Sequence, residues 1–299
     1  AHASGRDEND VDAMLKVCLD ALGFFGAVMG ATDVSMNTNA VIVEKLAGRR
    51  LLSGMHAFWS IGCFASAGLF SVLASSGLNV TLIATLHCAI VLALLAVFGR
   101  HLLDYKSPGG EKAFAIPRGI VIVLGILACI SFLVEGAVMD WSGVLLTEVK
   151  NMDIALAGTG YAIFSVAMLI MRLLGDKTVQ FLGEQKAVIG GSIVTAAGFA
   201  LVVILDNLYL NAFAFILIGL GCANIVPVFY SLLKYQKDMP ISAAVTSVTS
   251  LGYTGVILGP ALLGFVAHCI NISAVFELVA LLLVIEAGIA KSVFCKLKM

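Results

Sequence analysis

Long apolar stretches alternate with short polar breaks along almost the whole chain. The breaks contain glycine, proline, asparagine and charged residues, as at 48–50, 107–110 and 206–207, which is typical of loops between helices. A helix that crosses the hydrocarbon core of a membrane needs about 20 predominantly apolar residues. The pattern therefore predicts nine membrane-spanning helices, at residues 14–45, 54–76, 79–100, 118–147, 155–175, 186–205, 208–235, 241–269 and 272–294.

The composition requires lipid as the solvent for much of the chain. Of the 299 residues, 60% are hydrophobic and 12% are charged, whereas an ordinary soluble domain has about 45–50% and about 25%. The net charge of −1 argues against nucleic acid as a partner, because nucleic-acid binding requires a basic surface. The seven cysteines show no C-x-x-C spacing, so we interpret them as small buried apolar residues and expect no metal site or cofactor.

Basic residues gather at alternate ends of the predicted spans. If the first span runs from outside to inside, fifteen of the eighteen lysines and arginines lie at inner ends and loops, and only Arg6, Lys16 and Lys150 lie outside. Loops on the cytoplasmic side of a membrane carry the excess of Lys and Arg. We therefore predict a multi-pass protein of a plasma membrane with a cytoplasmic C-terminus.

A weak internal repeat predicts how the spans are grouped. Residues 30–33 (GATD) and 221–224 (GCAN) are offset by 191 positions, and a glycine-rich span follows each. Many transporters contain two copies of a helical unit. A six-helix unit divides the chain into a polar external segment at 1–13, half of a first bundle at 14–103, a cytoplasmic linker at 104–117 and a complete second bundle at 118–299. We expect three helices in front of residue 1, and we interpret the polar segment as a loop that follows them.

Several short blocks carry a resemblance to a known family. They are 33–37 (DVSMN), 43–44 (VE), 55–62 (MHAFWSIG), 135–137 (EGA) with 140–142 (DWS), 172–177 (RLLGDK) and Gly255-x-x-x-Gly259-Pro260. From about residue 15 to 295 the chain resembles the major facilitator superfamily, in particular its fucose-permease-like, YbjJ-type branch. The resemblance implies an all-α transmembrane fold, with the nine spans equivalent to helices 4–12 of twelve. It also implies secondary transport in a bacterial inner membrane, and not enzymatic activity.

The first span contains an acid near its middle. Asp33, Met36, Asn37, Ala40 and Glu44 lie on one face at helical spacing. Ionisable groups inside a membrane are expensive, and they mark ion or solute pathways. We therefore predict that Asp33 couples proton movement to transport, and the family resemblance also places an acid at this point of helix 4. The alternative is a structural acid that is bonded to a neighbouring helix.

Other polar residues are candidates for solute contact. Asn37, Asn224 and Tyr253 supply neutral donors and acceptors suited to the hydroxyls of a sugar-like solute, although such groups also join helices. Glu135 is predicted to lie in the outer half of the membrane, as a cavity residue or an external gate. Asp140 and Trp141 follow one to two turns further out, where tryptophan is common at the membrane interface. Glu286 lies on the last span, which the resemblance places at the periphery, so we give it no role.

A second group is predicted to close the cytoplasmic side. Asp176 resembles the acid of a superfamily loop signature. It can accept hydrogen bonds from a helix N-terminus, with Arg172 as its ionic neighbour; the alternative is a solvated loop acid. Glu44 and His56 are assigned gate or structural roles near the same face.

The sequence contains no Walker loop, catalytic Ser/His/Asp pattern or metal-ligand cluster. It therefore predicts a symporter that moves protons and a small polar, sugar-like solute across the bilayer by alternating access. One alternative is efflux of amphipathic compounds by proton antiport, which the lack of proline at 60–68 disfavours. Another is a membrane sensor without transport activity, or a truncated and inactive remnant of a transporter.

Overall fold

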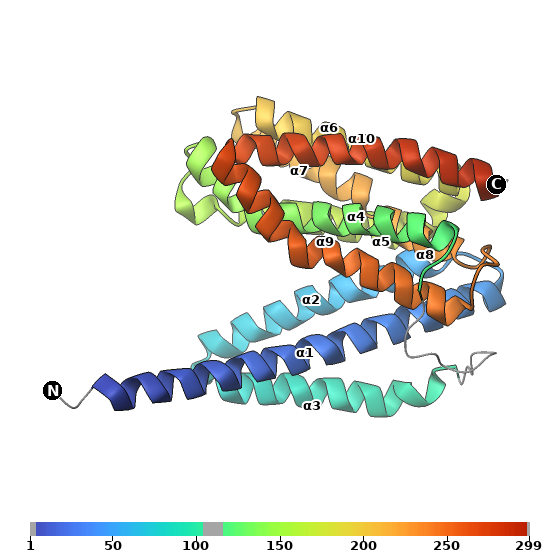
Figure 1. Ribbon diagram of the computed structural model, residues 1–299. Helices are drawn as coiled ribbons and strands as arrows, with labels where there is room; N and C mark the ends of the chain where they lie inside the picture. Colours follow the sequence, from blue (N-terminus) through green and yellow to red (C-terminus); the bar gives the residue numbers. More distant parts are fainter. Residues whose placement is uncertain (1–3, 104–115, 298–299) are drawn as a thin grey trace.

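The computed structural model describes residues 4–103 and 116–297 and is entirely helical within them, apart from the turns that join the helices (Figure 1). Residues 104–115, which make up most of the predicted linker at 104–117, lie outside the described residues. The helices are α1 (Ser4–Ala47), α2 (Leu52–Ser75), α3 (Val80–Phe98), α4 (Ile120–Val144), α5 (Thr159–Leu182), α6 (Glu184–Ile204), α7 (Leu208–Cys222), α8 (Ile225–Leu232), α9 (Ile241–Cys269) and α10 (Ile272–Leu297). One turn of π-helix continues α4 from Leu145 to Val149.

The nine predicted spans are confirmed as helices in the described residues. The predicted span 208–235 consists of two helices, α7 and α8, because the helix breaks at Ala223 and Asn224. Eight helical segments are long and apolar enough to cross a membrane, and α5, which carries Arg172, Asp176 and Lys177, is the span not among them. α1 begins at Ser4 and so includes most of the polar segment at 1–13.

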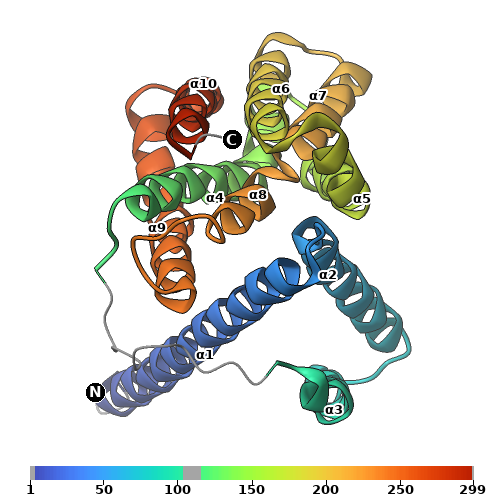
Figure 2. The same cartoon turned by 90° about the vertical axis from the view of Figure 1, so that its right-hand side faces the viewer.

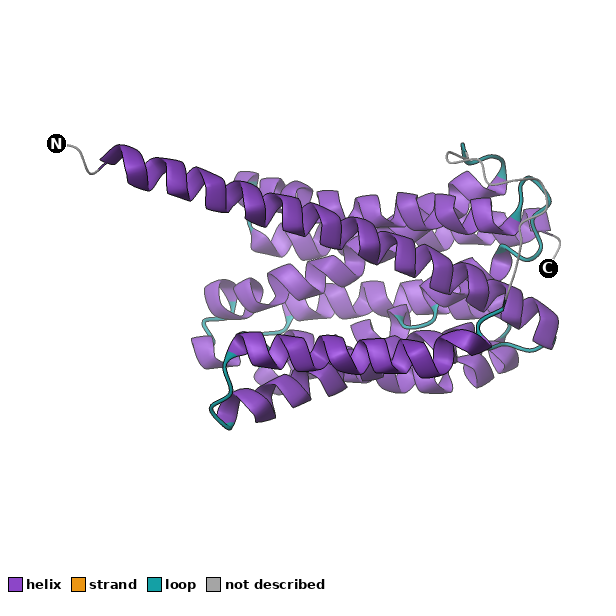
Figure 3. Cartoon of the chain, turned by 90° about the horizontal axis from the view of Figure 1, so that it is seen from below, coloured by secondary structure: helices purple, strands orange, loops and turns teal. Residues whose placement is uncertain are grey.

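The helices form two groups (Figure 2). In the larger group, α4 packs against α9, α6 packs against α7 and α10, and α5 packs against α7. The smaller group consists of α1, α2 and α3. Figure 3 shows from below that the helices of both groups run roughly along one direction.

The two groups meet through α1 and α2. α2 packs against α5 and α8, and α1 packs against α9 and α8. In Figure 1 the ribbons of α1 and α2 approach the larger group beside α8 and diverge from it toward the N-terminus of α1. We call the end beside α8 the closed end.

The apolar core lies mainly in the larger group. Large buried side chains such as Phe199, Phe215 and Phe276 fill the space between its helices. In α3, by contrast, Ile83 is the only buried residue among those described. The many exposed apolar side chains of α1–α3 are expected for helices that face lipid.

Small residues allow the closest helix contacts. A Cβ atom added at Gly255 of α9 would collide with the carbonyl oxygen of Cys129 in α4. Such glycines bring the backbones of membrane helices together.

Two glycines with positive φ shape the turns at the closed end. Gly48 follows α1 with φ of 62°, and Gly183 separates α5 from α6 with φ of 83°. Residues with a Cβ atom rarely adopt this conformation. These turns place Arg50 and Glu184 beside each other.

Candidate functional site

Two acidic residues cap the N-terminus of α2. The first four N–H groups of a helix have no partner within it, and Leu51, at the capping position, offers no side-chain acceptor. Glu44 Oε2 accepts hydrogen bonds from the N–H groups of Leu51 at 3.0 Å and Leu52 at 3.1 Å. The next two N–H groups are those of Ser53 and Gly54.

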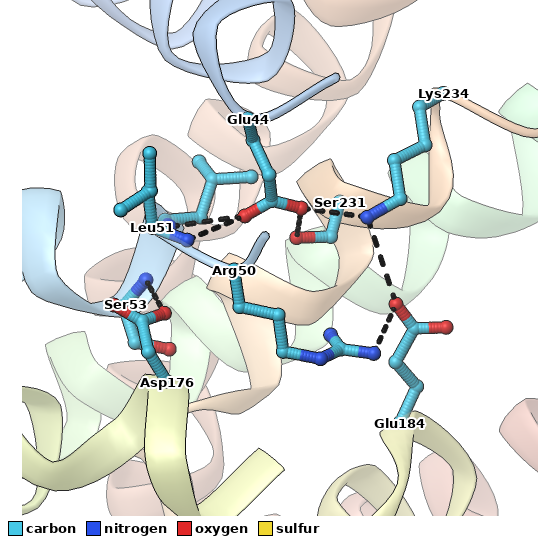
Figure 4. Close-up of polar contacts among 9 residues, drawn as sticks. Glu44, Arg50, Leu51, Ser53, Asp176, Glu184, Ser231 and Lys234 are labelled. Carbon is cyan, nitrogen blue, oxygen red and sulfur yellow. Dashed lines mark hydrogen bonds and ion pairs between the residues drawn. The ribbon is translucent and has the colours of Figure 1, made fainter. Parts of the chain in front are cut away.

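Asp176 accepts hydrogen bonds from these two N–H groups. Its Oδ1 accepts from Ser53 N at 3.1 Å (Figure 4). Its Oδ2 accepts from Gly54 N at 3.0 Å. Negative charge at a helix N-terminus is also favoured by the helix dipole. The predicted hydrogen bonds between Asp176 and a helix N-terminus are therefore present. They connect α5 of the larger group to α2 of the smaller one.

The other oxygen of Glu44 reaches the larger group as well. Glu44 is 2% exposed, and its Oε1 accepts from Ser231 Oγ at 2.7 Å and from Lys234 Nζ at 2.7 Å. Ser231 lies in α8, and Lys234 follows it. One buried carboxylate thus joins α1, the start of α2 and the end of α8.

A second ion pair extends the contact. Arg50 Nη2 lies 2.8 Å from Glu184 Oε1, and Lys234 Nζ lies 4.0 Å from the same oxygen (Figure 4). Lys234 therefore stands between two buried acids, Glu44 and Glu184. We use the name closed-end network for Glu44, Arg50, Asp176, Glu184, Ser231 and Lys234.

Arg172 does not pair with Asp176, so that prediction is wrong. Its Nη2 donates to Glu135 Oε1 at 3.2 Å and its Nη1 to Ser60 Oγ at 3.3 Å. The guanidinium is buried, and Ser60 belongs to α2, so this central pair also bridges the two groups.

The break between α7 and α8 explains the third contact of Arg172. Pro227 has no N–H group, so the carbonyl of Ala223, four residues earlier, has no helical donor. Arg172 Nε donates to this oxygen at 3.3 Å. The sequence does contain this signal, because a proline inside a predicted span frees the carbonyl four residues before it.

Glu135 lies about halfway along its helical run, which continues through the π-turn from Ile120 to Val149. Its depth in the membrane stays a prediction. The side chain of Glu135 is about one quarter exposed. This position allows the carboxylate to meet Arg172, which lies in the middle of α5.

Asp33 lies where α1 meets α9. It is partly exposed, and its carboxylate lies within interaction range of the side chains of Tyr253 and Asn37. The Tyr253 ring stacks on Phe132 of α4, with ring centroids 5.8 Å apart. The structure thus brings three predicted site residues together, Asp33, Asn37 and Tyr253.

The predicted polar face of α1 is mostly buried. Asn37, Ala40 and Glu44 are buried, whereas Met36 is exposed. Asn37 Nδ2 donates to the backbone oxygen of Asp33 at 3.0 Å, and Asn37 Oδ1 is buried without a hydrogen-bond partner in the described structure. This oxygen is an acceptor available to a bound molecule.

Asn224 lies at the break between α7 and α8. Its Oδ1 is buried without a hydrogen-bond partner among the described residues and faces Gly175 of α5, beside Ser53. The structure therefore places Asn224 next to the closed-end network. Asn224 and Asp33 match in the sequence repeat, but their side chains contact different residues.

The remaining predicted residues have local contacts. His56 Nδ1 donates to Leu52 O at 2.9 Å, and its ring centroid lies 6.1 Å from that of Tyr230. Asp140 is exposed. The Trp141 ring lies against α9 near Gly264, and its Nε1 is buried without a partner in the described part of the chain.

Three charged residues with buried contacts were missed from the sequence. Glu184 and Lys234 lie at helix ends, where charged residues are ordinary and give no signal. Glu286 was assigned to the periphery but is fully buried. A signal for it exists, because Val279, Leu283 and Ala290 lie on the same helical face and are also buried.

Comparison with known proteins identifies the family. No protein-family model matches the chain. The chain is 40% identical over 274 residues to an uncharacterised MFS-type transporter of Yersinia pestis, covering 91% of this chain and 71% of that protein. It is 31% identical to an uncharacterised transporter, y4wD, of Sinorhizobium fredii, covering 90% of this chain and 72% of the relative.

Solved structures share the fold. The E. coli fucose:proton symporter FucP matches with a TM-score of 0.63 at 13% identity, over 90% of this chain and 74% of that one. A bacterial homologue of the iron transporter ferroportin, in an outward-facing state, matches with a TM-score of 0.57 at 15% identity, over 83% and 64% of the two chains. The expected family resemblance is confirmed, and the family is one of transporters and not of enzymes. This multi-pass membrane protein belongs to the major facilitator superfamily.

Proposed function

We propose that the protein carries a small polar solute, such as a sugar, together with a proton across the plasma membrane by alternating access. The observation that carries the proposal is that the Asp33 carboxyl group of α1 lies within interaction range of the Tyr253 side chain of α9. A partly exposed acid can exchange protons with water, and here it also connects the two helix groups. Its charge state is therefore coupled to the contact between the groups.

The interaction between Asp33 and Tyr253 depends on whether Asp33 is protonated. An ionised Asp33 only accepts hydrogen bonds, whereas a protonated Asp33 also donates one. An ionised Asp33 attracts the Tyr253 hydroxyl more strongly than a protonated one, because a hydrogen bond to a charged acceptor is the stronger form. Proton binding thus weakens one link between α1 and α9 and favours a change in their relative position.

Groups near the midpoint of the helices supply contacts for a solute. The Arg172–Glu135 pair is charged and partly exposed through Glu135. Asn37 Oδ1 has no hydrogen-bond partner among the described residues, and Tyr253 presents a hydroxyl. Such a set of convergent donors and acceptors suits a molecule with several hydroxyl groups.

We also propose that the closed end faces the cytoplasm, together with the C-terminus. Its loops carry basic residues, including Arg49, Arg50 and Lys234, as the positive-inside rule requires. The closed-end network then holds the cytoplasmic side shut. In this arrangement 14–103 and 118–299 move relative to each other, and opening of the cytoplasmic side breaks the contacts of Glu44 and Asp176 with the other group.

The proposal is tested with the protein expressed from its full reading frame and reconstituted in liposomes that contain a pH-sensitive dye. A panel of aldoses is added outside, beginning with L-fucose. We expect at least one sugar to drive protons inward and acidify the lumen. Asp33→Asn should lose this signal, and Asp12→Asn, at an exposed acid of the polar segment, should retain it. Equal proton flux in wild type and Asp33→Asn would exclude the proposed coupling, and proton exit on addition of amphipathic compounds would favour antiport.

A further inference from the structure

A fully buried carboxyl group lies within the larger helix group, far along the chain from Asp33. Glu286 of α10 has no exposed surface. Ser131 Oγ of α4 lies 2.6 Å from its Oε1, and Ser192 Oγ of α6 lies 3.1 Å from its Oε2. Three helices therefore meet at one acid, and no Lys, Arg or His among the described residues lies within ion-pair distance of it.

The number of protons that the neighbouring serine hydroxyls can donate indicates whether Glu286 is charged or neutral. A serine hydroxyl has a single proton to donate. Ser192 Oγ also lies 3.0 Å from the carbonyl oxygen of Val188, which can only accept. If the Ser192 proton goes to Val188 O, then the contact between Ser192 Oγ and Glu286 Oε2 needs a proton from the acid.

A neutral Glu286 completes the arrangement. Ser131 donates to Oε1, Glu286 donates from Oε2 to Ser192 Oγ, and Ser192 donates to Val188 O. Each donor then has one acceptor. An ionised Glu286 would instead place an uncompensated charge among buried helices, which is strongly unfavourable.

We propose that Glu286 is a proton-binding site of the transporter, occupied in this conformation and separate from Asp33. The bound proton makes the hydrogen-bonded bridge that holds α4, α6 and α10 together. This inference does not depend on the role proposed for Asp33, because it rests on contacts within the larger helix group alone.

The charged and titratable groups on the surrounding helices connect this site to the central pair. On α4, Glu135 follows Ser131 by one helical turn. Cys222 of α7 is within electrostatic reach of Glu135, Arg172 and Glu286. On the other packed elements, α6 carries Glu184 and Lys186, α9 carries His268, the π-turn carries Glu148 and α10 itself carries Glu277. Because α4 carries both Ser131 and Glu135, loss of the proton from Glu286 would release the α4 segment that positions Glu135 against Arg172.

The proton can be observed directly by infrared spectroscopy. A protonated carboxylic acid has a carbonyl stretch that is resolved from amide and carboxylate bands. In an Asp33→Asn background, which removes the carboxyl group proposed to couple the proton, we expect this band at neutral pH. Glu286→Gln should remove it, whereas Glu277→Gln, at an exposed position on the same helix, should leave it unchanged.

A third variant assigns the band to this site. Ser131→Ala removes the donor to Oε1, the carbonyl oxygen in the proposed arrangement, and should shift the band to higher wavenumber. A spectrum in which neither Glu286→Gln nor Ser131→Ala alters the band would overturn the proposal.

Folding of the variant gives an independent criterion. The amide introduced by Glu286→Gln would accept from Ser131 and donate to Ser192, as the protonated acid does, so this variant should fold with a Tm close to that of wild type. At alkaline pH it should be more stable than wild type, because it cannot lose the proton. Failure of the variant to fold would indicate that the site requires a carboxylate, and would contradict the proposal.

Discussion

Glu44 Oε1 and Lys234 Nζ lie 2.7 Å apart although 190 residues separate them in the chain. The pair joins the end of α1 to the segment after α8, and the same carboxylate caps α2 through Leu51 and Leu52. A buried acid that holds three segments can stabilise the closed end only while all three stay together. In the proposed mechanism, the closed-end network therefore acts as a conformational latch as well as an ion-pair cluster.

Glu44 and Lys234 should not contribute independently to stability. Lys234→Met leaves the Glu44 charge buried, and Glu44→Gln leaves Lys234 with Glu184 at 4.0 Å as its remaining acid. Breaking a buried pair from one side costs about 3–5 kcal/mol. The double variant should lose clearly less stability than the sum of the single variants. Chemical or thermal unfolding of the four proteins in detergent gives this coupling energy, and additive losses would show that the pair is not coupled.

Asp176 should protect two particular backbone N–H groups. Asp176→Ala removes the acceptors of Ser53 N and Gly54 N but leaves those of Leu51 and Leu52, which Glu44 holds. A charge at a helix N-terminus contributes about 0.3–2 kcal/mol, which corresponds to at most roughly thirtyfold in exchange rate.

Hydrogen–deuterium exchange rates of individual amides test this prediction. The amides of Ser53 and Gly54 should exchange faster in Asp176→Ala, and those of Leu51 and Leu52 should not. Lys177→Gln, at the neighbouring position, serves as the control. Unchanged exchange at Ser53 and Gly54 would remove Asp176 from the latch.

The hydrophobic pattern was sufficient to predict the helices but not their partners. All nine predicted apolar runs are helical in the described residues, and eight helical segments are long and apolar enough to cross a membrane. The link between Asp176 and a helix N-terminus was also predictable, since a general physical rule determines what an acid near such an end accepts. The rotation of each helix about its axis is set by packing between distant segments.

The incorrect predictions arise because the sequence does not show how each helix is rotated about its axis. Arg172 and Asp176 lie one turn apart and suggest an ion pair, yet Arg172 turns to Glu135 and to a carbonyl that Pro227 leaves free. Glu286 was assigned to the periphery because the family resemblance places the last span there, although the buried residues on the same face of α10 indicate otherwise. Asn224 matched Asp33 in the repeat, but the break between α7 and α8 directs it toward Gly175.

Gly175 should tolerate no larger residue. An added Cβ atom would collide with Asn224 Oδ1 and lie 2.6 Å from Ser53 Cβ. Overpacking of this kind typically costs about 1–3 kcal/mol. Gly175→Ala should therefore lower the Tm, whereas Gly288→Ala, where nothing lies within 4 Å, should not. Equal Tm values for the two variants would contradict the close approach of α5 to α2.

The central pair should require arginine and not merely a positive charge. Arg172 donates to Glu135, Ser60 and Ala223 O from three different nitrogens. A lysine carries one ammonium group and cannot reproduce this planar geometry. Arg172→Lys should retain folding but lose most solute exchange, and Lys177→Arg, a charge-conserving change outside this pair, should be neutral. Full exchange activity in Arg172→Lys would exclude the three-way contact from the transport mechanism.

The coupling role of Asp33 is tested most directly by comparing two transport modes in the same liposomes. Once a transported sugar is known, its accumulation driven by a pH gradient and its exchange across the membrane without a gradient are measured for wild type and Asp33→Asn. We predict that Asp33→Asn abolishes accumulation and leaves exchange, because the neutral amide permits the movement of the helix groups but carries no proton. Accumulation at the wild-type level in Asp33→Asn would contradict the account.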